Sequence, residues 1–62
     1  MNADPLELFT VDDLCRILMI GKNTAYDLVI SHKIDSFKVG KSWKIPRAAI
    51  EKYVLEQAKG RK

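Results

Sequence analysis

Residues 37–45 (Phe-Lys-Val-Gly-Lys-Ser-Trp-Lys-Ile) alternate apolar and basic side chains around a glycine. An alternation with a period of two is typical of β-strands with one buried face, and glycine is common where a hairpin turns. The sequence therefore predicts a two-stranded hairpin with one apolar and one basic face. The residues expected to pack on a core are Phe37, Val39, Trp43 and Ile45.

The register of this hairpin follows from keeping the apolar side chains together. Pairing Val39 with Trp43, and so Phe37 with Ile45, places all four on one face and predicts a three-residue loop. A two-residue loop would pair Lys38 with Trp43 and split the apolar set, so the three-residue loop is preferred. The loop residues would be Gly40, Lys41 and Ser42.

Charge is unevenly distributed along the chain, which carries a net charge of +3. Residues 36–47 contain four basic side chains and no acidic one, whereas residues 1–13 contain four acidic and no basic ones. A positive end of this kind suits a polyanion such as nucleic acid. The alternative is a solvated strand whose lysines prevent aggregation. The basic residues concerned are Lys38, Lys44 and Arg47, with Lys41 at the tip.

A first helix is predicted after Thr10, which can act as an N-cap with Asp13 three residues later. Apolar residues then recur at helical spacing, and the helix should end near Met19, ahead of Gly21. The expected buried stripe is Val11, Leu14, Cys15 and Leu18.

A second helix is predicted from Lys22 to about His32, with Gly21 or Asn23 as its cap. The link between the two helices is only three or four residues long, which matches a helix-turn-helix. Ile20 would fill the corner, and the start of the second helix would face the major groove of DNA. The buried stripe of this helix would be Ala25, Leu28 and Val29.

Pro46 should end the hairpin and open a third helix. The predicted fold is therefore α+β and mostly α: a winged helix-turn-helix with a hairpin wing and a C-terminal helix. The domain would span residues 9–58, between a flexible acidic arm (1–8) and a basic tail (59–62). The third helix would bury Ala49, Ile50, Tyr53 and Val54.

Composition narrows the function classes. A single Cys and a single His exclude an internal disulfide and a structural zinc site, so Cys15 is interpreted as a core residue. The chain has no phosphate-binding loop and no recognisable nucleophile–base pair, so neither an enzyme nor a cofactor is expected. No targeting segment or membrane span is visible, and we expect a cytoplasmic, nucleoid-associated protein.

Three motifs carry a resemblance to a known family. They are residues 9–14 (Phe-Thr-Val-Asp-Asp-Leu), residues 23–26 (Asn-Thr-Ala-Tyr) and residues 37–47, which continue the hairpin through Ile-Pro-Arg. Over residues 9–55 the chain resembles the excisionase-type DNA-binding domains, which are small winged helix-turn-helix proteins related to MerR-type regulators.

The resemblance implies a role without catalysis. Family members bind repeated sites in double-stranded DNA near the end of an integrated phage or mobile element, bend the DNA, and contact the integrase. They thereby favour excision. The chain is expected to be a monomer that binds such sites cooperatively. Two alternatives are a small transcriptional regulator and, from another class, an adaptor whose basic wing binds an acidic protein.

Carried onto this sequence, the resemblance makes the second helix the recognition helix and the hairpin the wing. Asn23 can bond an adenine edge, while Lys22 or Thr24 would hold the backbone; capping is the alternative for Asn23 and Thr24. Tyr26 either reaches a phosphate or is merely half-buried. Trp43 is expected in the core rather than stacked on bases.

Three positions depart from the family pattern: Gly21 replaces a capping Ser, Asp27 a basic residue, and His32 a Gly. Asp27 would repel phosphate, or accept from a cytosine amino group. The predicted DNA contacts are Lys22, Asn23, Thr24, Tyr26, Asp27, Lys38, Gly40, Lys41, Ser42, Lys44 and Arg47.

Overall fold

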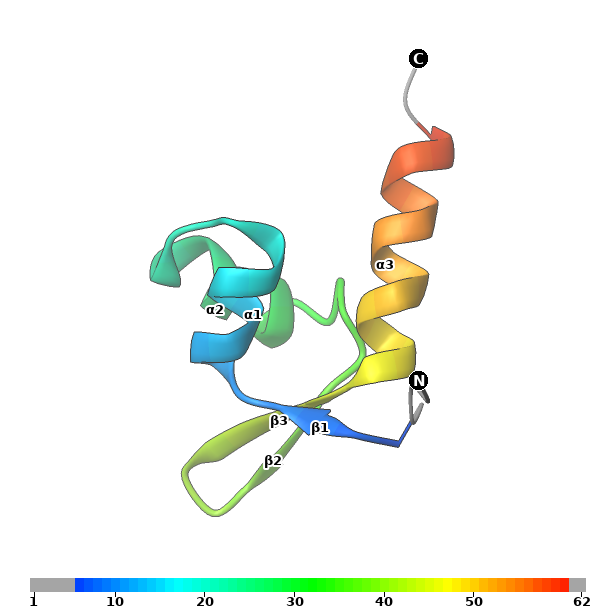
Figure 1. The fold of residues 1–62 in the computed structure, drawn as a ribbon. Helices are drawn as coiled ribbons and strands as arrows, with labels where there is room; N and C mark the ends of the chain where they lie inside the picture. The colour runs from blue at the N-terminus through cyan, green and yellow to red at the C-terminus, as the bar shows by residue number, and fades with distance from the viewer. Residues whose placement is uncertain (1–5, 61–62) are drawn as a thin grey trace.

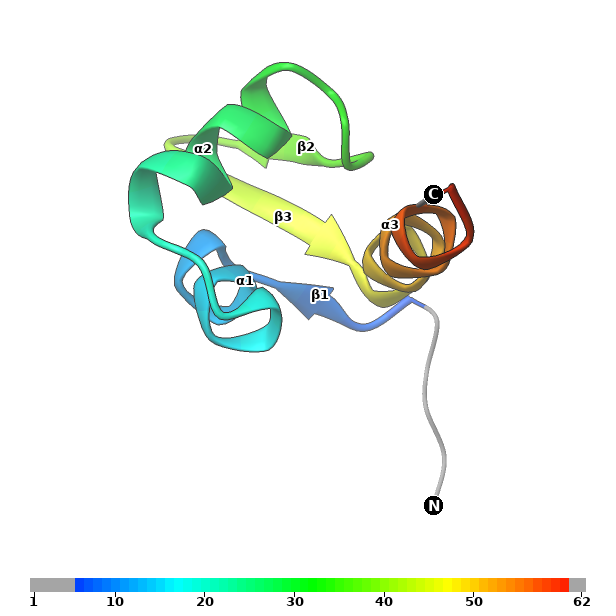
Figure 2. The ribbon, with the colours of Figure 1, turned by 90° about the horizontal axis from the view of Figure 1, so that it is seen from above.

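The computed structural model describes residues 6–60, which form three helices and a small antiparallel sheet (Figure 1). The sheet has the strand order β1-β3-β2. Seen from above, α1 lies beside β1, α2 beside β2, and α3 stands at the end of β3 (Figure 2). The predicted α+β, mostly helical, winged helix-turn-helix fold is confirmed. The elements are β1 (Leu8–Phe9), α1 (Val11–Leu18), α2 (Lys22–Ile30), β2 (Phe37–Val39), β3 (Ser42–Pro46) and α3 (Arg47–Gly60).

The predicted capping box begins α1. The Asp13 N–H donates to Thr10 Oγ1, and the Thr10 N–H donates to Asp13 Oδ2, both at 3.1 Å. These bonds satisfy two amides at the helix start that have no partner within the helix. The helix ends as predicted: Met19 adopts a left-handed backbone with φ 59°, and the Ile20 N–H donates to the Cys15 carbonyl.

A similar left-handed residue ends α2. His32 has φ 64°, its N–H donates to the Val29 carbonyl at 3.2 Å, and the Lys33 N–H donates to the Leu28 carbonyl at 3.0 Å. This is a Schellman motif, in which the left-handed position is usually Gly. Histidine therefore takes up the conformation for which the family pattern has glycine, and α2 ends at Ile30, two residues before the predicted end.

The core lies between the helices and β3. Ile34, in the connection from α2 to β2, is 1% exposed and was not predicted. Its neighbours Lys33, Asp35 and Ser36 are polar, so no periodic pattern marks it. Val54, expected in the core, is 41% exposed because α3 extends beyond the sheet. The buried residues are Val11, Leu14, Ala25, Leu28, Val29, Ile34, Ile45, Ala49 and Ile50.

The predicted hairpin register is wrong by one residue. Val39 pairs with Ser42 and Lys38 with Trp43, so the loop has two residues, Gly40 and Lys41. Gly40 has φ +61° and Lys41 does not have a positive φ, as the two-residue turn with glycine at its first central position requires. The tight turn sets the register, although it divides the apolar residues between the two faces.

In this register, β2 directs toward the core the face that the sequence predicted to be exposed. Phe37 and Val39 lie on the outer face with Lys44, and they are 45% and 55% exposed. Lys38, expected on the outer face, shares the inner face with Trp43 and places its Nζ 5.7 Å from the centre of the indole ring. Trp43 itself is half-buried against the core, as expected.

The short strand β1 was not predicted. It pairs with β3 through Leu8 and Pro46, and through Phe9 and Ile45, so the C-terminal end of the predicted arm lies in the sheet. Residues 1–5 of that arm, and 61–62 of the predicted tail, fall outside the described residues; Lys59 continues α3. Within residues 6–60, no helix has both the length and the hydropathy that a membrane span needs.

Candidate nucleic-acid interface

The two helices of the helix-turn-helix are joined by residues 19–21. Ile20 packs half-buried against the core in this turn, as the sequence predicted. Gly21 is the N-cap of α2, and the helix has no side-chain capping bond. The capping alternative for Asn23 and Thr24 is therefore not the one that the structure adopts, and both side chains lie exposed at the start of α2.

The outward surface of α2 carries the five predicted recognition residues. Ala25, Leu28 and Val29 point into the core, which turns the remaining positions of the first two turns toward solvent. Tyr26 is 40% exposed and lines a groove between α2 and the wing, and exposure alone does not separate the phosphate-binding role from the half-buried one without a ligand. The exposed residues of this surface are Lys22, Asn23, Thr24, Tyr26 and Asp27.

A groove of about 290 Å³ separates α2 from the wing, and we call it the wing groove. Its walls come from three parts of the chain: the start of α1, one side of α2, and the tip of the hairpin. In Figure 1 the hairpin tip and α2 lie on the same side of the molecule, opposite α3. The lining residues are Thr10, Val11, Asp12, Lys22, Tyr26, Lys41, Ser42 and Trp43.

The wing groove therefore unites four predicted site residues that lie up to twenty positions apart: Lys22 and Tyr26 from α2, and Lys41 and Ser42 from the wing. Amino, phenol and hydroxyl groups are the side-chain donors that commonly hold DNA phosphates. The arrangement offers such donors from both walls. A single phosphodiester strand lying along the groove would meet both the helix and the wing.

Asp12 is a functional candidate that the sequence analysis missed. Its Oδ1 lies 2.9 Å from Lys22 Nζ, and both side chains are about two-thirds exposed. The carboxylate of Asp12 accepts a hydrogen bond from Lys22 and also attracts its charge, which raises the pKa of Lys22 above the ordinary 10.5. The two residues lie on different helices, so no local sequence pattern indicates the pair.

The remaining wing residues lie around the groove or behind it. Gly40 and Lys41 form the exposed turn, Lys38 covers Trp43, and Lys44 is half-buried on the outer face beside Phe37. The basic side chains of the wing are thus spread over its two faces and its tip. They do not form the single basic face that the sequence analysis predicted.

Arg47 is not part of the wing groove. It lies at the opposite end of β3 from the hairpin turn, and its Nη2 donates to Glu7 Oε1 at 2.8 Å. Its guanidinium also lies 5.1 Å from the centre of the Phe9 ring. These contacts tie Arg47 to β1, whereas the sequence analysis placed it with the phosphate-binding lysines.

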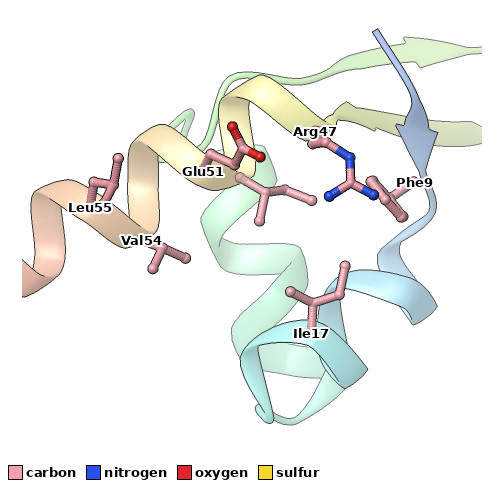
Figure 3. Close-up of a pocket in the computed structure, with 7 residues that line it drawn as sticks. Phe9, Ile17, Arg47, Glu51, Val54 and Leu55 are labelled. Atoms are coloured by element: carbon pink, nitrogen blue, oxygen red, sulfur yellow. The ribbon is translucent and has the colours of Figure 1, made fainter. Parts of the chain in front are cut away.

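A second, larger groove lies between α3, α1 and β1 (Figure 3). It has a volume of about 550 Å³ and is walled mainly by apolar side chains, together with the charged side chains of Arg47 and Glu51. Figure 3 shows Ile17 on α1 and Val54 on α3 pointing into the space between the two helices, with Leu55 farther along α3. We call it the α3 groove. Its lining residues are Phe9, Ile17, Arg47, Ile50, Glu51, Val54 and Leu55.

Comparison with known proteins agrees with this architecture. The model of a family described as "Helix-turn-helix domain" matches residues 8–58, which include every element described above except the end of α3. The chain belongs to this helix-turn-helix domain family. The match also supports the resemblance to excisionase-type domains that the sequence motifs indicated.

A curated relative carries the same indication. The chain is 39% identical over 46 residues to a protein of Saccharopolyspora erythraea named "Probable excisionase". The aligned region covers 74% of this chain and 47% of the relative, so the chain spans about half the length of the curated relative it matches. No solved structure matches the chain.

Proposed function

We propose that this chain is a small DNA-binding excisionase. It binds and bends double-stranded DNA near the end of an integrated prophage or mobile element and directs the integrase toward excision. The observation that carries the proposal is the wing groove, which is lined by donors from both α2 and the wing tip. The helix-turn-helix family match and the similarity to a probable excisionase support it.

In the proposed complex, α2 enters the major groove and the wing lies on the adjacent backbone. Asn23 contacts an adenine edge, and Asp27 accepts from a cytosine amino group, which is how an acid is accommodated on a recognition helix. Lys22, Thr24 and Tyr26 hold the flanking phosphates. The wing contributes Lys38, Lys41, Ser42 and Lys44, while Gly40 lets the turn approach the backbone closely.

The DNA contact is tested by fluorescence anisotropy across a salt series. One duplex is taken from the end of the element that encodes the chain, and the other is a scramble of equal length. Three to five phosphate contacts predict a log–log salt slope of roughly −3 to −4.5. A Lys41→Glu, Lys44→Glu variant should lose binding, whereas Lys52→Glu, Lys59→Glu on α3 changes the net charge equally and should retain it.

Two outcomes would contradict the proposed contact between the wing and DNA. Equal losses in the two charge-reversal variants would mean that net charge, and not the wing, determines binding. Absence of binding to both duplexes at low salt would exclude the DNA contact altogether and favour the adaptor. Binding to a single promoter site without any effect on recombination would instead indicate a transcriptional regulator.

The integrase contact is proposed for the α3 groove (Figure 3), which shares no lining residue with the wing groove. Leu55 is 61% exposed there, so an apolar surface remains open to a protein partner while α2 and the wing hold DNA. Leu55→Glu should abolish excision in a reconstituted assay with the element's integrase, yet leave anisotropy binding intact. Gln57→Glu makes the same charge change on α3 outside the groove and should excise normally. Normal excision by Leu55→Glu would refute this contact.

A further inference from the structure

The carboxylate of Asp12 has no part in the proposed function, yet it lies in the wing groove. It is the only acidic group among the described residues that line this groove. Its Oδ1 is 2.9 Å from the Nζ of Lys22, so the groove lysine on the recognition helix already has an anionic partner. A phosphate entering the groove must compete with that partner.

The competition is possible because the ion pair is weak. Lys22 and Asp12 have side chains that are 62% and 66% exposed, and exposed pairs of this kind gain little in water and are screened by salt. Lysine donates to a carboxylate oxygen and to a phosphate oxygen with the same ammonium group and imposes little geometry of its own. Exchange of one anion for the other therefore requires no rearrangement of the fold.

The rest of the groove is suited to the incoming group. Lys41 and Ser42 from the wing and Tyr26 from α2 line the same cavity as the ion pair. Its volume of about 290 Å³ is on the order of ten times the volume that one water occupies in the liquid, so a phosphate fits beside these side chains.

We propose that the carboxylate of Asp12 is a resident anion, which a phosphate of the DNA backbone displaces from Lys22. This inference rests on the proposed DNA-binding function and adds Asp12 as a residue that limits the affinity for DNA. Displacement takes place at every DNA sequence, because it concerns the backbone only. Asp12 therefore lowers the affinity for all DNA and keeps non-specific binding weak, without changing the preference for one sequence over another.

The test is a double-mutant cycle in low-salt anisotropy binding to a short mixed-sequence duplex. The variants are Asp12→Asn, Lys22→Gln and the double variant, and Glu56→Gln on α3 serves as the control for net charge. Asp12→Asn should bind about two- to five-fold tighter, the range that corresponds to one exposed ion pair. The gain should disappear in the Lys22→Gln background, where there is no ammonium to release. Circular dichroism verifies that each variant is folded.

The possible outcomes separate this inference from the function on which it rests. If Asp12→Asn gains the same factor with and without Lys22, Asp12 acts by general repulsion and the exchange is refuted. If it gains no more than Glu56→Gln, Asp12 has no special role, although wild-type binding still supports the DNA contact. If the wild type fails to bind, both proposals fail. If dilute inorganic phosphate, at constant ionic strength, displaces DNA from the protein, the groove is a site for the free phosphate ion and not for the DNA backbone.

Discussion

Arg47 donates from both Nε and Nη2 to Oε1 of Glu7, which lies 40 positions earlier in the chain, at 3.2 and 2.8 Å. The backbone N–H of Arg47 also donates to the Glu7 carbonyl at 2.8 Å. The same guanidinium packs over Phe9. One residue thus fastens the beginning of α3 to the segment that leads into β1, so we assign Arg47 a stabilising role first.

Replacing Arg47 with alanine should destabilise the fold by about 1–2 kcal/mol, the combined loss of a half-exposed ion pair and a cation–π contact. Urea unfolding monitored by Trp43 fluorescence measures the change. Lys52→Ala removes an exposed cation from the same helix and should change the free energy of unfolding by less than about 0.5 kcal/mol. Equal effects of the two substitutions would show that the contacts with Glu7 and Phe9 contribute nothing.

Met19 is a second site of predicted stability change. It has φ 59°, a conformation that costs a residue with a β-carbon roughly 1–2 kcal/mol, and its side chain is 88% exposed. Met19→Gly should therefore stabilise the protein by about 0.5–1 kcal/mol, after the greater entropy of an unfolded glycine is subtracted. Met19→Ala keeps the β-carbon and should give no such gain in thermal unfolding. A loss of stability in Met19→Gly would contradict the left-handed assignment.

Gly40 should be the most sensitive position in the hairpin turn. A β-carbon built there meets nothing within 4 Å, so the cost of Gly40→Ala comes only from φ +61° and should be about 1–2 kcal/mol. D-alanine prefers positive φ, and a chemically synthesised chain with D-alanine at position 40 should be at least as stable as the wild type. Similar unfolding midpoints for the two alanine variants would refute the backbone explanation.

Whether the sequence predicted a feature correctly depended on how far apart in the chain the residues that determine it lie. Capping at Thr10 and the apolar stripes of α1 and α2 depend on residues three or four positions apart, and these predictions were confirmed. The hairpin register depended on whether burial of Phe37 or the preference of the turn would prevail, and the sequence does not weigh these against each other. Burial of Ile34 depends on tertiary packing alone.

In the candidate site, too, the features set by local spacing were predicted, and those set by tertiary packing were not. Exposure of the predicted residues on α2 followed from the positions of its apolar stripe. The meeting of Lys22 with Lys41 in the wing groove required the wing to be placed against α2, and the Asp12–Lys22 ion pair joins two helices across a turn. Neither has a signature in local spacing. The four basic residues of 36–47 looked equivalent in sequence, whereas Arg47 lies at the opposite end of β3 from Lys41 in the turn.

Acid should weaken the fold through Asp13. The Thr10 N–H that donates to its carboxylate lowers the pKa of Asp13 below the ordinary 3.8, with smaller contributions from the Thr10 hydroxyl and the charge of Arg16. Because the folded-state pKa is the lower one, this stabilisation is complete above about pH 4 and is lost as the pH falls through the folded-state value. Unfolding free energies measured between neutral and strongly acidic pH should fall less steeply for Asp13→Asn. An unchanged pH profile would contradict the capping role of the carboxylate.

The separation of Lys41 from Arg47 makes a prediction about salt. Lys41 lines the wing groove, whereas Arg47 is bonded to Glu7 at the other end of β3. If Lys41 neutralises one phosphate, Lys41→Ala should reduce the magnitude of the log–log salt slope of DNA binding by about 0.9. Arg47→Ala should leave the slope unchanged at a temperature where circular dichroism shows that the variant is folded. A reduction of the slope by Arg47→Ala alone would move the phosphate contacts from the wing groove to the β1 end of the sheet.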